Sequence, residues 1–194
     1  GWTDVFNRTN YNMTSVTEDG YYWAAEDMSS GNPYLTLDQI NISGASSFVL
    51  QLDLIVKHFD KMDQLDEIKI TYQIDGGSVQ NLLWFQSTRP DNFNTVFAID
   101  TDFDGDGECG AATTLSHRTG GDNDTGSGEA SCTATNDGFA TYTSPVVALS
   151  SNSTLDIKIQ YFSMTSTDEG VYIDNIIVTT DPEKCTIAGN SGFR

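Results

Sequence analysis

The stretch Phe48-Val49-Leu50-Gln51-Leu52-Asp53-Leu54-Ile55-Val56 repeats with a period of two. Every second residue from Phe48 to Val56 is apolar, and the residues between them include Gln51 and Asp53. Because successive side chains of a β-strand point to opposite faces, this pattern predicts a strand with one buried face. The same alternation recurs at residues 68–74 and 155–161, so the sequence predicts antiparallel strands that face a core on one side.

Shorter apolar segments continue the pattern, and turn signals such as Asp75-Gly76-Gly77 separate them. Only residues 59–67 could hold a helical turn. About nine strands, with no helices to cover parallel crossovers, predict an all-β, antiparallel two-sheet β-sandwich of jelly-roll type. The shorter candidate strands are residues 21–25, 34–42, 82–86, 95–99, 139–143 and 171–178.

The chain has 194 residues, of which 38% are hydrophobic, and this is enough apolar material for one core. We expect a single β-sandwich domain over residues 1–180 and a C-terminal tail over residues 181–194. Residues 101–136 interrupt the strand pattern because they are rich in glycine and aspartate and almost free of large apolar side chains. They are predicted to form a long acidic loop insertion, and loops of this length are usually functional or held by a metal.

The charge is strongly acidic, with 28 Asp and Glu against 9 Lys and Arg and a net charge of −19. Such a surface repels phosphate backbones and anionic lipid, which argues against nucleic-acid partners. No apolar run reaches the roughly 18 residues that a membrane-spanning helix needs, so no membrane insertion is expected. The partner that this charge favours is a cation, above all calcium.

Acidic residues alternate around glycines at the start of the insertion. Carboxylates at alternate positions let a chain curl so that several oxygens meet one hard cation. An EF-hand is excluded, because counting twelve positions from Asp100 or Asp102 reaches no glutamate. The alternative is a solvated acidic turn. The candidate calcium ligands are Asp100, Asp102, Asp104, Asp106 and Glu108.

A second acidic group stands near the two ends of the sandwich. Glu26 and Asp27 follow an aromatic run, and Asp174 lies within the last candidate strand. If the first and last strands are neighbours, these three carboxylates could share a second calcium ion. The alternative is that they are separate surface acids.

The cysteines favour an oxidising, extracellular setting, and the sequons permit a glycosylated secreted protein. Cys109 and Cys132 flank the polar insertion and are predicted to form a disulfide, which leaves Cys185 unpaired or bonded to another chain. A zinc site is the weaker alternative, because paired CxxC spacing is missing. Five Asn-x-Ser/Thr sequons are candidate glycosylation sites, at Asn7, Asn12, Asn41, Asn123 and Asn152.

Catalysis has little support in the sequence. His58 and His117 are the only histidines, and no Gly-x-Ser-x-Gly motif is present. We therefore expect no catalytic residues. Carboxylate pairs for glycoside hydrolysis are possible among so many acids, but nothing singles one out.

Aromatic residues could instead form a platform on which sugar rings stack. Trp84 lies in an apolar stretch and Trp23 alternates with Tyr21 and Ala25, so both are expected in the core. Tyr22 and Tyr172 alternate outward, and Trp2 stands near the beginning of the sequence. These three are the candidate ligand-binding residues.

Several of these motifs occur together in one known group of domains. Asp19-Gly20-Tyr21-Tyr22-Trp23-Ala24-Ala25-Glu26-Asp27, Ile74-Asp75-Gly76-Gly77 and Val171-Tyr172-Ile173-Asp174-Asn175-Ile176 resemble segments of jelly-roll accessory domains in large secreted microbial proteins. The chain is also similar in outline to MAM, cleaved-adhesin and carbohydrate-binding jelly rolls. The resemblance covers residues 1–103 and 137–179. It implies a structural calcium at Glu26, Asp27 and Asp174, and it leaves residues 104–135 unexplained.

Together these features predict an extracellular or cell-surface, calcium-stabilised binding module for adhesion or carbohydrate recognition. Its partner would be a glycan or an extracellular protein surface. The alternative is a structural subunit of an assembly that is bridged by calcium or joined through edge strands. An N-terminal segment, residues 2–6, that leaves its own sheet would favour this alternative. A polysaccharide-processing enzyme is the third possibility.

Overall fold

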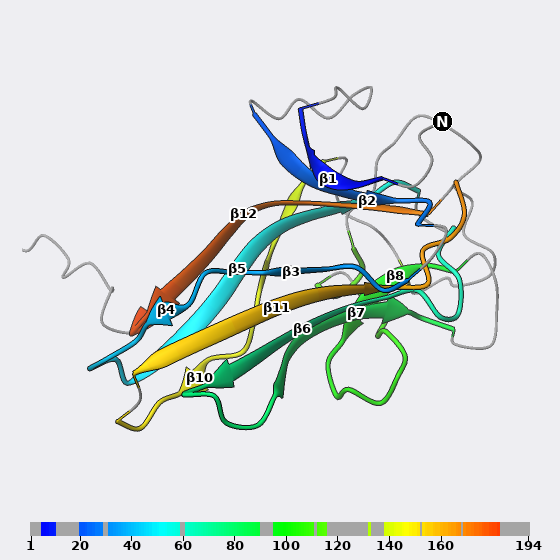
Figure 1. The fold of residues 1–194 in the computed structure, drawn as a ribbon. Coiled ribbons are helices and arrows are strands. Elements are labelled where there is room, and N and C mark those ends of the chain that lie inside the picture. The colour runs from blue at the N-terminus through cyan, green and yellow to red at the C-terminus, as the bar shows by residue number, and fades with distance from the viewer. Residues whose placement is uncertain are drawn as a thin grey trace, which may run out of the picture.

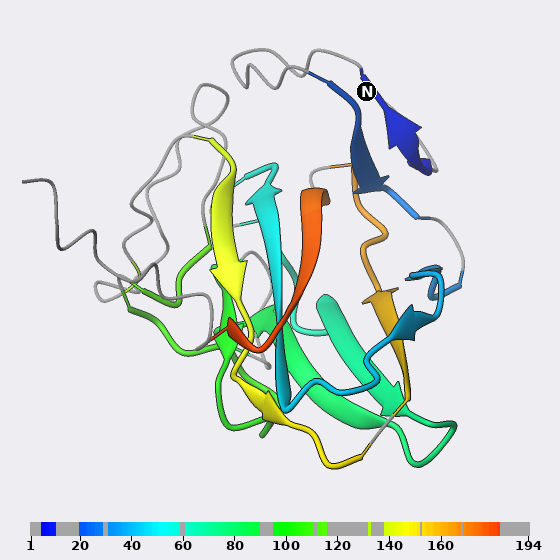
Figure 2. The ribbon, with the colours of Figure 1, turned by 90° about the vertical axis from the view of Figure 1, so that its left-hand side faces the viewer.

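The computed structural model describes residues 5–10, 20–28, 31–58, 61–89, 95–110, 112–115, 132, 138–151, 153–167 and 169–182. These residues form two antiparallel sheets of six strands each, packed face to face as a sandwich. Figures 1 and 2 show the two layers, with β5 and β12 in one layer and β6 and β11 in the other. The predicted all-β sandwich is therefore confirmed, and the jelly-roll path stays a prediction.

The first sheet has the order β1-β2-β12-β5, and the far edge of β5 pairs with both β9 and β10. Figure 2 shows β9 and β12 on the two sides of β5. Ser144 lies between β9 and β10, and its backbone N–H donates to the carbonyl of Leu50 in β5. The bounds are β1 (Val5–Thr9), β2 (Tyr22–Glu26), β12 (Gly170–Thr180), β5 (Ser47–Val56), β9 (Ala140–Thr143) and β10 (Val147–Ala148).

The second sheet has the order β3-β11-β6-β7-β8, and β4 also pairs with β11. A register shift between Ile70 and Thr71 marks an irregularity in the pairing of β6 with β7. The bounds are β3 (Tyr34–Thr36), β4 (Ile40–Asn41), β11 (Thr154–Phe162), β6 (Glu67–Ile74), β7 (Gln80–Ser87) and β8 (Phe97–Asp100).

The core lies between the sheets, where the predicted alternation places it. Leu50, Leu52 and Leu54 of β5 are fully buried, and Ile157 and Ile159 of β11 face them in the same cluster. Burying each such side chain stabilises the fold by about 1.5–3 kcal/mol relative to leaving it exposed.

The first strand was not predicted. β1 pairs with β2 over its whole length, and its Phe6 ring packs edge to face on Trp23 and Tyr161, at centroid distances of 5.1 and 5.4 Å. The described part of the N-terminal segment therefore stays in its own sheet, which gives the alternative of strand exchange between subunits no support.

Other expectations fall partly outside the described residues. Residues 61–67 form a turn and an isolated bridge from Met62 to Thr95, and no helical turn appears among them. Of the predicted tail, only Asp181 and Pro182 are described, and Asp181 accepts hydrogen bonds from the backbone N–H and hydroxyl of Ser46. In the described part of the chain, no helix has the length and apolar character needed to cross a bilayer.

Candidate metal centre

The acidic loop begins where β8 ends, at the edge of the second sheet. Asp100 is the last residue of β8 and is 1% exposed. Its carboxylate accepts a hydrogen bond from the backbone N–H of Phe103 at 2.5 Å and from that of Gly105 at 3.2 Å. The Asp100 carboxylate, at the end of the strand, thus holds the residues that follow it in a turn.

The loop then returns against the sheet. Phe103 and Gly105 have positive φ angles of 62° and 112°, which let the chain turn sharply. The backbone N–H of Gly107 donates to the carbonyl of Ser87 at 3.0 Å. A Cβ atom at Gly107 would lie 2.8 Å from the Ala98 carbonyl oxygen, so this close approach requires glycine.

These turns gather four carboxylates at one place. Asp100, Asp102, Asp104 and Glu108 each offer one oxygen, and the four oxygens lie within 4.8 Å of one another. The sequence predicted all four. The fifth candidate, Asp106, is not part of this group, and its carboxyl group hydrogen-bonds to that of Asp104.

The electrostatics of the loop follow from this crowding. Burial raises the pKa of the Asp100 carboxyl, and the N–H groups of Gly105 and Phe103 offset part of that rise. The hydrogen bond between Asp104 and Asp106 raises the pKa of Asp106 to about 6 and lowers that of Asp104. Close carboxylates repel one another, and a bound cation would relieve that repulsion.

The donor set suits a hard cation. All four side chains offer carboxylate oxygens, with no imidazole or thiolate among them, which is the ligand chemistry of calcium or magnesium rather than zinc. Three of the four are at least partly exposed, so further oxygens from water can complete a calcium shell of six to eight ligands.

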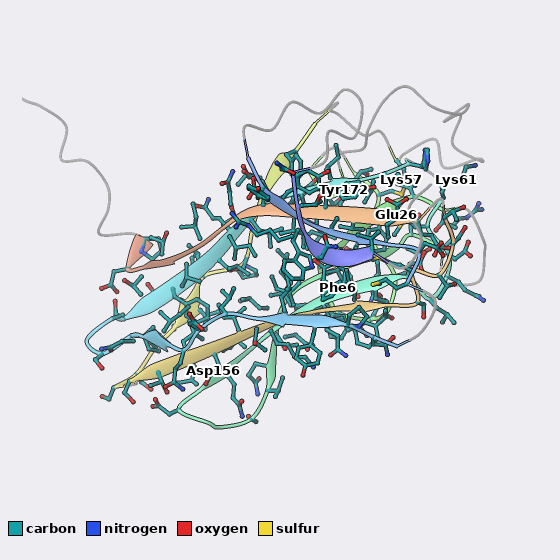
Figure 3. The ribbon with its side chains drawn as sticks, turned by 45° about the horizontal axis from the view of Figure 1, so that its top comes forward. Phe6, Glu26, Lys57, Lys61, Asp156 and Tyr172 are labelled. Carbon is teal, nitrogen blue, oxygen red and sulfur yellow. A yellow bond between two sulfur atoms is a disulfide. The ribbon has the colours of Figure 1, made fainter. Side chains whose placement is uncertain are left out.

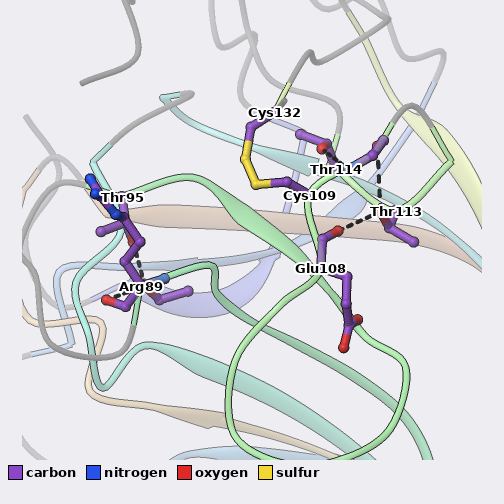
Figure 4. Close-up of a disulfide and its surroundings, with 9 residues drawn as sticks. Arg89, Thr95, Glu108, Cys109, Thr113, Thr114 and Cys132 are labelled. Carbon is purple, nitrogen blue, oxygen red and sulfur yellow. Dashed lines mark hydrogen bonds between the residues drawn. A yellow bond between two sulfur atoms is a disulfide. The ribbon is translucent and has the colours of Figure 1, made fainter. Parts of the chain in front are cut away.

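A disulfide closes the base of the loop. Cys109 and Cys132 are bonded, with their Cα atoms 4.7 Å apart, as the sequence predicted (Figure 4). Next to it, the Thr113 hydroxyl donates to the backbone carbonyl of Glu108, and the Thr114 hydroxyl accepts from the N–H of Gly110. The last ligand of the cluster is therefore held by a covalent link and a hydrogen-bonded turn.

The structure does not bring the second predicted acidic group together. Glu26 pairs in register with Gly170, four residues before Asp174 on β12, which corresponds to about 13 Å along a strand. Asp174 instead lies opposite Asp53 on β5. β2 and β12 are neighbours, but their register separates Glu26 from Asp174.

Glu26 has other partners. Its carboxylate is 2% exposed, forms an ion pair with Lys57 and accepts a hydrogen bond from the Tyr172 hydroxyl at 2.9 Å (Figure 3). The Lys57 ammonium also donates to the carbonyl of Thr167 at 2.6 Å. Glu26 is thus neutralised by a lysine rather than gathered with Asp27 and Asp174.

The aromatic platform proposed from the sequence is also corrected. Tyr22 is 8% exposed and Tyr172 is 3% exposed, and their rings pack edge to face at 5.7 Å in a small apolar cluster. They do face outward from the first sheet, but they are covered there and offer no stacking surface. Trp2 lies outside the described residues.

A different row of side chains crosses the outer face of the second sheet. Tyr34, Gln160, Lys69, Trp84 and Asp100 are register partners on five adjacent strands. The alternation places the core residues of these strands on the opposite face. Trp84 was expected in the core, and only the pairing of β6 with β7 shows that it faces outward beside Lys69.

This row carries exposed aromatic surface. Tyr34 is 56% exposed, and the Lys158 ammonium lies 4.4 Å from its ring centroid. At the other end of the row, the Phe103 ring packs edge to face on Trp84 at 5.2 Å, so the acidic loop contacts the row directly.

A groove lies on the same face, over β3, β11 and β6. It encloses about 350 Å³ and is bordered by polar side chains that include Gln73, Asp156, Lys158 and Gln160. Val79 of the β6–β7 turn supplies an exposed apolar contact.

The remaining candidate residues are only partly described. Asn7 and Asn41 are exposed on β1 and β4, where glycosylation would be sterically possible. His58 is buried, at 8% exposed. Asn12, Asn123, Asn152, His117 and Cys185 lie outside the described residues.

Comparisons with known proteins add no family. No protein-family model matches this chain, and no curated protein matches it significantly. The resemblance to secreted jelly-roll domains is therefore supported as far as the two-sheet antiparallel sandwich and no further.

Proposed function

We propose that this chain is a non-catalytic, calcium-stabilised module of an extracellular protein, and that it binds glycans across the outer face of the second sheet. The observation that carries the proposal is the row from Tyr34 to Asp100, which joins an exposed aromatic ring to the acidic loop. The disulfide supports the location, because such bonds persist in oxidising compartments.

The chemistry of this face suits a sugar. Sugars present hydroxyl groups along their edges and C–H groups on their faces, so a site for them combines polar side chains with an aromatic ring. The groove provides Gln73, Asp156 and Gln160 as hydrogen-bonding partners, and the exposed ring of Tyr34 stands beside Gln160. The net charge of −19 favours neutral glycans over polyanionic ones.

Calcium would act through the loop rather than on the sugar. With Asp100, Asp102, Asp104 and Glu108 neutralised, the loop keeps its curled shape and Phe103 stays against Trp84. Calcium binding is measured first by titration calorimetry on the calcium-free protein. Asp104→Asn should weaken binding at least tenfold, because the Asp104 carboxylate lies in the cluster and is otherwise exposed.

Glycan binding is then tested on an array in calcium, followed by calorimetry with the best oligosaccharide. Tyr34→Ala should weaken binding at least tenfold. The matched control is Tyr21→Ala, because Tyr21 is 51% exposed and has Arg8 at 4.7 Å from its ring, but directly precedes β2 of the other sheet. Equal losses in both variants, or an array without any bound glycan, would refute the sugar site and leave the calcium site standing.

A further inference from the structure

Gln86 of β7 is a buried polar side chain whose amide makes no hydrogen bond. It is 1% exposed, and neither its amide oxygen nor its amide nitrogen has a hydrogen-bond partner. A buried amide that has left water without gaining a hydrogen bond destabilises the fold. Native proteins rarely leave such a group unsatisfied, so this amide points to a partner that binds beside it.

Gln86 lies on the outer face of the second sheet, on the strand next to the acidic loop. Trp84 faces outward and pairs with Asp100, and Gln86 follows two residues later on the same face, opposite Ala98. Diagonal neighbours across a strand pair remain within reach of long side chains. The register therefore makes Gln86 and Asp100 diagonal neighbours on one face.

The acidic loop crosses the sheet directly over Gln86. A Cβ atom at Gly107 would lie 2.6 Å from the Gln86 carbonyl oxygen and 2.8 Å from that of Ala98. The N–H of Gly107 also donates to the carbonyl of the next residue on β7, Ser87, at 3.0 Å. Because a side chain on the outer face meets water unless something covers it, this crossing explains why the Gln86 amide is buried.

A cation held by the loop would have a wet side and a dry side. Asp102, Asp104 and Glu108 are at least partly exposed, so water can supply further ligands there. On the side of Asp100, which is 1% exposed, further ligands have to come from the protein. Calcium accepts the carbonyl oxygens of Asn and Gln side chains as well as carboxylates. A neutral oxygen also adds a ligand without adding to the repulsion among four carboxylates.

We propose that the Gln86 side chain supplies its Oε1 atom to the calcium ion of the acidic loop. This inference rests on the proposed function, because it adds a ligand to the loop site proposed there. The four carboxylates hold the ion from the loop and from the end of β8, and the amide ties it to β7. Calcium binding thus gives the buried amide oxygen a partner and fastens the loop to two strands.

Gln86→Met tests the ligand, because methionine has a similar length and no oxygen. Calcium affinity is measured by titration calorimetry on the calcium-free protein. The variant should bind calcium about fivefold more weakly, since a water molecule replaces one ligand oxygen. The matched control is Gln80→Met, because Gln80 is exposed and lies at the other end of β7. This control should bind calcium with unaltered affinity.

The number of water molecules on the bound ion is a readout that a purely structural role would not move. Terbium(III) occupies calcium sites, and its luminescence decay in ordinary and in heavy water counts the bound waters. Gln86→Met should raise this count by about one, whereas Gln86→Glu keeps an oxygen at the same place and should leave it unchanged. In excess EDTA, Gln86→Met should melt no lower than the unaltered chain, because it removes a buried amide without a partner.

The first titration, on the unaltered chain, separates the two ways in which this reasoning can fail. If that chain binds neither calcium nor terbium, the loop site fails and the role of Gln86 fails with it. If it binds calcium, but Gln86→Met has the same affinity and the same number of bound waters, only the inference about Gln86 is overturned. An equal loss of affinity in Gln80→Met would overturn it as well.

Discussion

The ion pair of Lys57 with Glu26 is expected to make the largest electrostatic contribution to the stability of the first sheet. Its ammonium pairs with Glu26, whose carboxylate is 2% exposed, and the Tyr172 hydroxyl is the other partner of that carboxylate. The substitution Lys57→Met keeps most of the side-chain volume and removes the positive charge. It leaves a buried carboxylate with one neutral hydrogen-bond donor.

Breaking a buried ion pair from one side costs about 3–5 kcal/mol, because the remaining charge stays desolvated. For a chain of about 200 residues, each kcal/mol corresponds to about 2–4 °C in melting temperature. We therefore expect Lys57→Met to lower the melting temperature by about 6–20 °C. The double variant Lys57→Met with Glu26→Gln removes the stranded charge as well, and it should recover most of the loss.

The free energy of unfolding is measured by urea denaturation followed by circular dichroism, for Lys57→Met, for Glu26→Gln and for the double variant. The control is Lys69→Met, because the pair of Lys69 with Glu67 has side chains 25% and 23% exposed. Exposed pairs contribute less than about 1 kcal/mol. A loss at Lys57 no larger than the loss at Lys69, or a double variant no more stable than Lys57→Met, would refute the reasoning.

Three further predictions concern the loop and the turns. Replacing Cys109 and Cys132 with serine opens a link of sequence separation 23 and should cost about 3 kcal/mol of unfolding free energy in urea denaturation. Gly107→Ala should weaken calcium binding by calorimetry, because its Cβ would meet the backbone carbonyls of β7 and β8. Hydrogen bonds from Ser153 and its neighbour lower the pKa of Asp75, so the stabilisation is present above the ordinary aspartate pKa and is lost in acid. The melting temperature of Asp75→Asn should therefore lie below that of the unaltered chain at pH 7, and the difference should shrink as the pH falls below 4.

The sandwich could be predicted because its strands carry a clear period of two. In β6 and β11 each core residue is flanked by polar ones, and in β5 every second residue is an apolar core residue, so the alternation can be read without knowing the strand order. β1 escaped prediction because Phe6 is the one ring that it packs against the core, while Asn7 and Arg8 are exposed. β10 has two residues, too few for any periodicity.

The loop cluster could be predicted because its ligands lie within nine consecutive residues. Asp100, Asp102 and Glu108 are brought together by turns that their own side chains cap, so local sequence is enough. Asp106 lies outside this group of four, although its carboxyl group hydrogen-bonds to that of Asp104.

A site whose residues lie on strands that are distant in the sequence is harder to predict, because it depends on the register between those strands. Glu26 and Asp174 lie on neighbouring strands, as expected, but a register that pairs Glu26 with Gly170 keeps them four residues apart. A shift of four residues in that pairing would have placed them opposite each other.

The same argument explains why the turns at Asp66 and Glu169 could not be found from the sequence. Each carboxylate stands in an ordinary polar stretch before a strand, where acids are usually solvated. They are buried where one turn leads into β6 and the other into β12, and the packing that buries them is not visible in either local sequence. Burying the carboxyl groups of Asp66 and Glu169 costs free energy, and this cost opposes the packing of the two sheets.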